Sequence, residues 1–255
     1  MREGTEGKEM NGKLLLIALC VVAALGCSDD SGDGSFKDPR DGQVYKTVKI
    51  GDQVWMAQNL NYGKPLESKS ELSLGEKWCY GDSLANCEKY GGLYIWKVAK
   101  ESCPEGWHLP TAEEWMALEK FVRQSLPKQE CKEKYLDGSC KIWEEDHEAE
   151  ATALASKDGW ENYVGENSFG FNALPGGIHV DWDGGKFAYL GGYTVWWSAT
   201  EEWVPDDPQI QKWARMIGPQ AETFGIDLLQ GNIGWADCCS PENVQYGASV
   251  RCVKD

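Results

Sequence analysis

The cysteines constrain the fold of this 255-residue chain more than any other feature. Cys20 lies within an apolar N-terminal segment, and Cys27 lies two residues after the end of that segment. Eight others remain: Cys79, Cys87, Cys103, Cys131, Cys140, Cys238, Cys239 and Cys252. An even number of cysteines in an exported chain is typical of a disulfide framework, so we expect a disulfide-stabilised domain. Eight cysteines allow about 105 connectivities, and spacing does not choose among them.

These cysteines do not form a metal-binding pattern. No pair has the Cys-x-x-Cys spacing, and the histidines at His108, His147 and His179 are too scattered to form a ligand pair on one helix. The two carboxylates in "DWDGG", Asp181 and Asp183, could hold calcium, but an exposed hairpin tip explains them equally well. We therefore expect neither a metal nor a cofactor.

The N-terminal segment predicts export. Leu14–Leu25 is a run of twelve apolar residues. A membrane-spanning helix needs roughly 20 residues, so this run is too short to span. With Lys13 before it, the run fits the apolar region of a signal peptide over residues 1–27. Because signal peptides usually begin with basic residues, Met10 is a candidate for the true start of the chain.

The end of the apolar run resembles a bacterial lipobox, in which a cysteine is acylated and becomes the mature N-terminus. The motif is "ALGC", residues 24–27, and its Ala-Leu order departs from the usual pattern. Cys27 is therefore the candidate lipidation site, and an ordinary cleaved signal is the alternative. Residues 28–37 are expected to form a flexible linker. The resemblance implies an exported protein, lipid-anchored at the outer membrane or cell surface.

The charge of the chain excludes some classes of partner. Its formal net charge is −16 at pH 7. Such an acidic chain repels phosphate backbones, so we expect no nucleic-acid partner. It also resists anionic membranes, because it lacks the basic patch that such surfaces attract. Membrane association would then depend on the N-terminal lipid anchor alone.

Local patterns predict a hairpin and a short strand. Residues 43–56 alternate apolar and polar side chains on both sides of a Gly-Asp turn, which is typical of a β-hairpin. Residues 61–77 are loop-like. The segment "LYIW", residues 93–96, is expected to form a strand after a Gly-Gly turn.

The segment "CPEGWHLPTAEEW", residues 103–115, predicts the start of a helix. Thr111 and Glu114 form a capping box, and Trp115 begins an apolar face at helical spacing. His108 is interpreted as a structural histidine near this helix start, because no partner carboxylate or cysteine is evident in the sequence. The motif therefore predicts a helix pinned into a core and no catalytic site.

The remaining sequence predicts one domain over residues 38–255. Residues 127–147 are highly charged and are interpreted as an insertion, stapled by a Cys131–Cys140 bridge. A second short helix is expected in "EAEATALASK", and short strand signals follow from Phe169 onward. This order of elements predicts an α+β domain with two short helices and several short antiparallel strands.

Six motifs occur in the order "DGQVYKTVKIGDQVWMAQNLNY", "CEKYGGLYIW", "CPEGWHLPTAEEW", "FGFNALPGG", "WWSATE" and "ASVRCVKD". Together they resemble the Fibrobacter succinogenes major paralogous domain family, over about residues 38–126 and 148–255. The resemblance implies a lipoprotein or secreted protein of a fibre-degrading bacterium. It implies a fold of the C-type lectin-like and formylglycine-generating-enzyme group, and no settled biochemical activity.

The resemblance also implies one disulfide. In C-type lectin-like domains a cysteine near the first helix pairs with one on the last strand, and Cys103 and Cys252 occupy those places. The spacing in "CYGDSLANC" suggests a local bridge between Cys79 and Cys87. The adjacent cysteines at 238–239 could form a vicinal disulfide, which we favour, two bridges to other partners, or a free pair.

Motifs of related enzymes and calcium-dependent lectins are missing from the sequence. Formylglycine-generating enzymes use a pair of cysteines near the C-terminus, and the spacing of the cysteines here does not match. The Glu-Pro-Asn and Trp-Asn-Asp motifs of lectins have only faint counterparts in "WAD", residues 235–237, and "PEN", residues 241–243. We therefore predict a non-catalytic protein.

Tryptophan is the remaining functional signal, with 13 in the chain. Five lie in motifs that we assign to the core: Trp55, Trp78, Trp96, Trp107 and Trp115. In "VWWSAT" successive side chains point to opposite faces, so one of Trp196 and Trp197 is expected to be buried and the other nearer the surface. Trp182, Trp203 and Trp235 lie in polar, turn-rich surroundings and are the candidates for exposed, ligand-binding side chains.

We expect the loop-rich half, residues 176–243, to bind plant cell-wall polysaccharide through these three tryptophans. Asp181 and Asp183 would accept hydrogen bonds from sugar hydroxyls. An acidic surface fits a neutral glycan better than an anionic one. The alternatives are an envelope protein that binds the same loops, a structural module, and an enzyme similar to formylglycine-generating enzymes.

Overall fold

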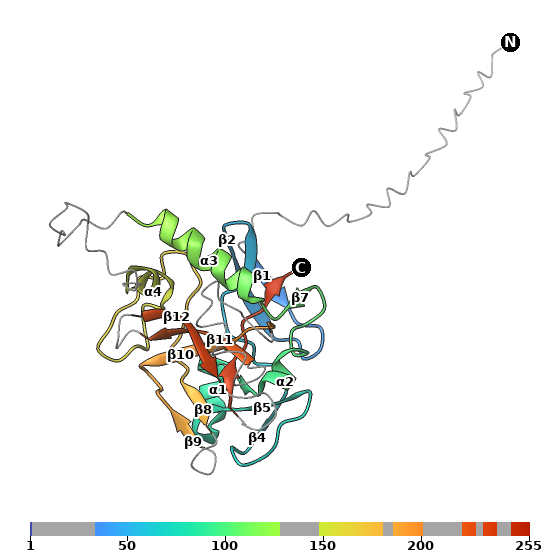
Figure 1. Ribbon diagram of the computed structural model, residues 1–255. Helices are drawn as coiled ribbons and strands as arrows, with labels where there is room; N and C mark the ends of the chain where they lie inside the picture. Colours follow the sequence, from blue (N-terminus) through green and yellow to red (C-terminus); the bar gives the residue numbers. More distant parts are fainter. Residues whose placement is uncertain (2–33, 128–147, 181–185, 201–220, 228–231, 239–245) are drawn as a thin grey trace, which may run out of the picture. The chain divides into compact units, whose positions relative to one another are not determined.

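The computed structural model describes residues 1, 34–127, 148–180, 186–200, 221–227, 232–238 and 246–255. The chain divides into two units, Met1–Asp30 and Ser31–Asp255, and all elements below belong to the second. This unit is a mixed α+β fold with many short strands and few helices, as the sequence predicts (Figure 1). Within these described ranges, no helix is long and apolar enough to cross a membrane.

Strand β1 corrects the predicted linker. Residues 28–33 of that linker lie outside the described part, as do Cys27 and nearly all of the predicted signal peptide. Residues Gly34–Lys37, however, form β1, which pairs antiparallel with β2 (Val44–Ile50). These residues form a strand because Phe36 packs it against the domain. The ring centroid of Phe36 lies 5.3 Å from that of Trp107. The strands of the domain therefore begin before residue 38.

The first sheet is built on the predicted hairpin. Strands β2 and β3 (Gln53–Met56) pair antiparallel, and Gly51 in their turn has a φ of 61° that favours glycine. The sheet order is β1-β2-β3-β14-β7, with β7 at Trp107–His108 and β14 at Val253–Lys254. The last strand of the chain thus lies between the hairpin and the segment that precedes α3.

The second sheet has the order β12-β11-β10-β13-β6-β5-β4. Its strands are β4 (Lys64–Leu66), β5 (Glu76–Trp78), β6 (Leu93–Tyr94), β10 (Tyr193–Trp197), β11 (Ala221–Asp227), β12 (Asn232–Cys238) and β13 (Ala248–Ser249). The pairs β4–β5 and β10–β13 are parallel, so the prediction of antiparallel strands holds only in part. Parallel neighbours require a crossover connection, which local patterns do not reveal. Strands β8 (Ile178–Val180) and β9 (Lys186–Ala188) form a separate antiparallel pair.

The described helices are short apart from one. They are the 3-10 turn η1 (Tyr80–Asp82), α1 (Leu84–Tyr90), α2 (Trp96–Ala99), α3 (Ala112–Ser125) and α4 (Glu148–Leu154). The predicted capping box of α3 is confirmed: the Glu114 N–H donates to Thr111 Oγ1 at 3.3 Å, and the Thr111 N–H donates to Glu114 Oε2 at 2.8 Å. The predicted second helix corresponds to α4, which lies next to α3 (Figure 1).

Two local predictions need correction. Residues 61–77, expected to be loop, contain β4 and most of β5, because these strands complete the edge of the second sheet beside β6. The strand expected at residues 93–96 ends at Tyr94, and Trp96 begins α2. Trp96 is half-buried, and its Nε1 donates to the carbonyl of Ser198 at 2.8 Å, a contact that the helical turn allows.

Strand β10 is buried on both faces. Trp196 packs in the cluster beneath α3 and α4, where its ring centroid lies 5.8 Å from that of Trp115. Trp197 points into the other apolar cluster and donates from Nε1 to the carbonyl of Tyr94 at 2.6 Å. Their exposed fractions are 0% and 2%, so the expectation that one lies nearer the surface is wrong. The strand lies inside its sheet, and packed side chains cover both faces.

Candidate functional site

The predicted ligand-binding residues fall largely outside the described part of the chain. Asp181, Trp182, Asp183 and Trp203 belong to segments that the structure does not describe. Trp235 lies on β12, opposite Phe224 of β11, and its side chain is likewise not described. The polysaccharide site therefore stays a prediction at these positions.

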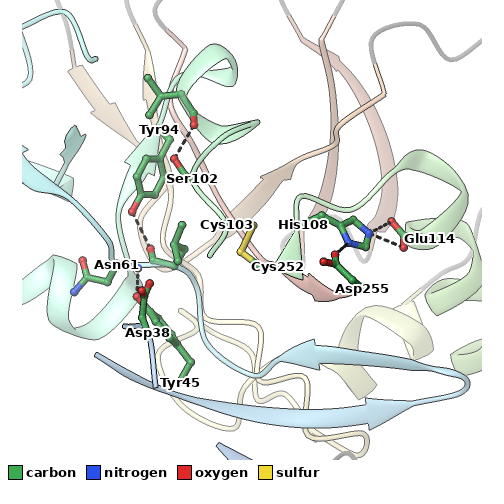
Figure 2. The surroundings of a disulfide bond; sticks show 12 residues. Asp38, Tyr45, Asn61, Tyr94, Ser102, Cys103, His108, Glu114, Cys252 and Asp255 are labelled. Atoms are coloured by element: carbon green, nitrogen blue, oxygen red, sulfur yellow. Dashed lines mark hydrogen bonds and ion pairs between the residues drawn. A yellow bond between two sulfur atoms is a disulfide. The ribbon is translucent and has the colours of Figure 1, made fainter. Parts of the chain in front are cut away.

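Two disulfides lie within the described part. Cys79 is bonded to Cys87, eight positions away. Cys103 is bonded to Cys252 across a separation of 149 positions, the pairing that the family resemblance implies (Figure 2). The remaining candidates lie outside the described residues or, at the end of β12, have no described side chain: Cys131, Cys140, Cys238 and Cys239.

The most exposed aromatic side chain of the described residues is Tyr189, in the turn between β9 and β10. Its exposed fraction is 58%, and its backbone adopts a left-handed φ of 62°. A left-handed conformation is rare for a bulky residue and costs about 1–3 kcal/mol, and such strain is concentrated at functional sites. The carbonyl of Tyr189 accepts from the N–H groups of Gly192 at 3.2 Å and Tyr193 at 3.1 Å, which closes the turn.

Tyr193 is the fixed partner of this exposed ring. The two ring centroids are 6.0 Å apart with an interplanar angle of 76°, an edge-to-face arrangement. Tyr193 is half-buried and packs against the core at the start of β10, so it fixes one side of the pair. We call residues 189–193 the tyrosine turn.

Glu161 lies directly on the tyrosine turn. Its N–H donates to the carbonyl of Gly191 at 2.7 Å. A Cβ at Gly191 would lie 2.7 Å from Glu161 Cγ and 3.0 Å from both Cδ and Oε1, so the side chain crosses the bare glycine. The same segment carries two more exposed side chains, Tyr163 and Val164. A carboxylate and an exposed aromatic ring therefore share one small surface.

The tyrosine turn contrasts with the tryptophans of the chain. Every tryptophan side chain that the structure describes is buried, except Trp96, which is half-buried. The core assignment of the other four motif tryptophans is therefore confirmed. Tyr189 is not among the predicted binding residues, because tryptophan was the aromatic signal on which that prediction rests. The signal that could have found it is "AYLGGY", in which two glycines turn the chain between two tyrosines.

His108 is held between two carboxylates (Figure 2). Its Nδ1 lies 2.6 Å from Asp255 Oδ1, and its Nε2 lies 2.8 Å and 3.0 Å from the two carboxylate oxygens of Glu114. Partial burial lowers the pKa of His108, but the hydrogen bonds to Asp255 and Glu114 outweigh this effect and raise the pKa above its ordinary value. We call these three residues the histidine clamp.

The histidine clamp lies near the helix start, and it corrects the expectation that no carboxylate partner exists, while the structural role of His108 stays a prediction. Glu114 is the capping-box residue of α3, and Asp255 follows β14, 147 positions from His108. Both ring nitrogens are taken by carboxylates, which leaves neither free to activate a nucleophile. The clamp therefore joins β7, β14 and α3 beside the Cys103–Cys252 bond.

Lys77 is a buried cation that the sequence analysis did not single out. Its ammonium donates to the backbone carbonyl and, at 2.6 Å, to Oδ1 of Asn61. Burial lowers the pKa of Lys77 to about 8, against a smaller opposing effect of Asp41. Both acceptors belong to one loop residue, so the contact fixes the chain before β4.

Arg251 is a second buried cation, and neutral oxygens hold it. Its Nε and Nη2 donate to Asn59 Oδ1 at 3.0 Å and 2.6 Å, and its Nη1 donates to the carbonyls of Met56 and Phe171 at 3.1 Å and 2.6 Å. Trp196 Nε1 donates to the same Asn59 oxygen at 2.8 Å. Burial lowers the pKa of Arg251 to about 9. This network ties the end of the chain to the core.

Metal binding finds no support in the described ranges, which contain no group of three or more His, Cys, Asp or Glu side chains placed to hold an ion. Among the described surfaces, the tyrosine turn with Glu161 is the candidate functional site. It combines an exposed ring, a strained backbone and a carboxylate, and it lies within residues 176–243, apart from Glu161, which packs onto it.

Comparisons with known proteins agree with the order of motifs in the sequence. The sequence profile of the Fibrobacter succinogenes major domain matches residues 48–254. No curated protein and no solved structure shows a significant match to the chain. Because the profile match spans most of the sequence, from β2 to β14, the chain belongs to the Fibrobacter succinogenes major domain family.

Proposed function

We propose that this protein is a non-catalytic, surface-exposed domain that binds plant cell-wall polysaccharide, with the tyrosine turn as part of the binding surface. The observation that carries the proposal is the exposed ring of Tyr189 at a left-handed φ of 62°. A glycine or asparagine would adopt this conformation at lower cost. The presence of a bulky aromatic residue there supports a role for the ring itself.

Physical chemistry favours a sugar as the ligand of such a surface. An exposed aromatic face can cover the apolar C–H face of a pyranose, and that burial is driven by the hydrophobic effect. Polar groups near the ring then bind the hydroxyls, and we assign this role to the Glu161 carboxylate, which lies beside Gly191 of the tyrosine turn. The three predicted tryptophans at positions 182, 203 and 235 are proposed to extend the same surface.

The fold proposal is a C-type lectin-like domain. Two features support it: the Cys103–Cys252 bond, and the sheet in which β14 lies between β3 and β7. In such a domain the joined ends form the base, and the long connections carry the ligand site. A crystal structure that superimposes on lectin-like domains with these two cysteines in register would support the proposal, whereas a different strand order around β14 would contradict it.

The localisation proposal is export to the outer membrane or cell surface, with a lipid on Cys27. The two disulfides support it, because disulfides persist in oxidising compartments outside the cytoplasm. Mass spectrometry of the mature protein should find a chain that begins at Cys27 with a diacylglyceryl or triacyl group. A mature chain with another N-terminus and no lipid would contradict the anchor.

The binding experiment is a pull-down of the purified, oxidised full-length chain on insoluble cellulose, xylan and mannan. Wild type should bind at least one of them, and Tyr189→Asn should bind about tenfold more weakly, since an aromatic contact of about 1.4 kcal/mol is lost. The matched control is Val44→Thr, which replaces another exposed apolar side chain, with an exposed fraction of 54%, on β2 of the first sheet. Equal binding by wild type and Tyr189→Asn would show that the tyrosine turn is not the site.

A further inference from the structure

We infer that Glu161 is the specificity-determining residue of the tyrosine turn, and that it selects neutral polysaccharides with free hydroxyls over polysaccharides that carry carboxylates. This inference rests on the proposed polysaccharide-binding function and names its substrate class.

The position of Glu161 is fixed from two sides. Before it in the chain, Trp160 is buried and donates from Nε1 to the carbonyl of Ala173 at 3.1 Å. At Glu161 itself, the N–H donates to Gly191, which in turn donates its own N–H to the carbonyl of Pro175 at 3.0 Å. The backbone of Glu161 is thus tied to the tyrosine turn through main-chain hydrogen bonds. These bonds should persist when the Glu161 side chain is substituted.

Gly191 then decides where the carboxylate lies. Its φ of 85° is the left-handed conformation that glycine allows, and its missing Cβ is the space that the Glu161 side chain crosses. Gly191 is two positions from both Tyr189 and Tyr193. A side chain that lies against Gly191 through Cγ, Cδ and Oε1 therefore holds its carboxylate beside the middle of the tyrosine turn, between the two tyrosines in sequence.

The carboxylate of Glu161 has capacity for a ligand. It is exposed, and none of the residues that the structure describes donates a hydrogen bond or ion pair to it. An ionised carboxylate only accepts hydrogen bonds, with about four lone-pair sites. Sugar hydroxyls are donors that fit these sites, and hydrogen bonds from a hydroxyl to a charged acceptor are about twice as strong as neutral ones.

The same charge opposes acidic ligands. A uronate sugar stacked on Tyr189 would bring its carboxylate to the same turn that the Glu161 carboxylate lies against. Two like charges about 4 Å apart repel each other by about 1 kcal/mol in water and by more where water is excluded. The net charge of −16 acts in the same direction over longer distances. Neutral glucans, mannans and xylans are therefore the ligand class that this surface fits.

The test is affinity electrophoresis of the full-length chain in gels that contain soluble glucomannan, xylan or polygalacturonate. Wild type should be retarded by a neutral polymer and hardly by polygalacturonate. Glu161→Gln should bind the neutral polymer about five- to tenfold more weakly, because the charged acceptor is lost. Glu161→Lys should bind polygalacturonate better than wild type does.

The matched control is Glu166→Gln, which removes the same charge from the same loop but from a side chain that accepts from Ser168 Oγ at 3.0 Å and does not contact Gly191. It should bind like wild type. Loss of binding in Tyr189→Asn with unchanged binding in Glu161→Gln would overturn this inference and leave the proposed function in place. Retardation of wild type by polygalacturonate alone would overturn the inference, whereas retardation by none of the polymers would overturn the proposed function as well.

Discussion

Cys103 and Cys252 are covalently joined although 149 positions separate them in the chain (Figure 2). The bond closes a loop of 149 positions, which is most of the domain, whereas Cys79–Cys87 closes a loop of only eight positions. In the chain-entropy account, the stabilisation by a disulfide grows with the length of the loop that it closes in the unfolded state. The two bonds should therefore contribute unequally.

The first prediction concerns these two bonds. The double variant Cys103→Ser/Cys252→Ser should lose about 5 kcal/mol of unfolding free energy, and Cys79→Ser/Cys87→Ser about 2.5 kcal/mol. Urea unfolding under non-reducing conditions measures both values. Equal losses, or a larger loss for the local bond, would show that strain or packing and not loop length sets the contribution of each bond.

The second prediction is a pH dependence of the histidine clamp. Because the folded pKa of His108 is raised, its stabilisation is fully present below the unfolded pKa of about 6.5 and is lost as the pH rises through the folded pKa. His108→Gln should therefore be less stable than wild type at pH 6, by up to about 1 kcal/mol for such a partly exposed group. At pH 9 the difference should be gone.

The control for the histidine clamp is Glu113→Gln, which alters the first turn of α3 next to Glu114. Glu113 interacts with the helix terminus but not with the clamp, so its effect on stability should be the same at pH 6 and pH 9. Urea unfolding at both pH values measures this. A difference between His108→Gln and wild type that stays constant from pH 6 to pH 9 would contradict the clamp.

How far the sequence predicts this structure depends on the range of the interactions. The α3 helix was predictable because Thr111 and Glu114 are three positions apart and act locally. The contact between His108 and Asp255 was not predictable, since Asp255 is brought near His108 only when β7 pairs with β14. The burial of Trp197 also escaped prediction, because alternation along a strand does not reveal whether a sheet is covered on one face or on both.

The candidate site illustrates the same limit in another way. The sequence directs attention to tryptophans in polar surroundings, and the structure describes none of their side chains. The site that the structure does describe depends on a backbone angle at Tyr189 and on a glycine, Gly191, that Glu161 crosses. A left-handed tyrosine cannot be read from composition, because propensity argues against it.

The third prediction concerns Lys77. Burial lowers its folded pKa to about 8 from 10.5, so the unfolded chain binds more protons between these values and stability should rise with pH across that window. Lys77→Met should lack this rise. Between pH 8 and 10.5, wild type should gain roughly 1–2 kcal/mol more unfolding free energy than Lys77→Met, after allowance for solvent screening.

Urea unfolding of wild type and Lys77→Met at pH 7.5 and pH 10.5 tests the assignment. The matched control is Lys97→Met, which removes an exposed lysine from α2 and should leave the pH dependence as in wild type. If wild type and Lys77→Met gain the same stability over this range, the buried ammonium is not the group that titrates.

The last prediction separates the function of Tyr189 from its stability. Because asparagine adopts a left-handed φ more readily than tyrosine, Tyr189→Asn should be as stable as wild type or more stable, by up to about 1 kcal/mol. Tyr189→Val should be less stable, since a β-branched side chain is disfavoured at positive φ. Urea unfolding ranks the three proteins. A gain in stability together with a loss of polysaccharide binding is expected where strain is retained for function. If Tyr189→Asn is instead destabilised by more than about 1 kcal/mol, the ring is a packing element of the turn, and the strained backbone no longer supports a ligand site.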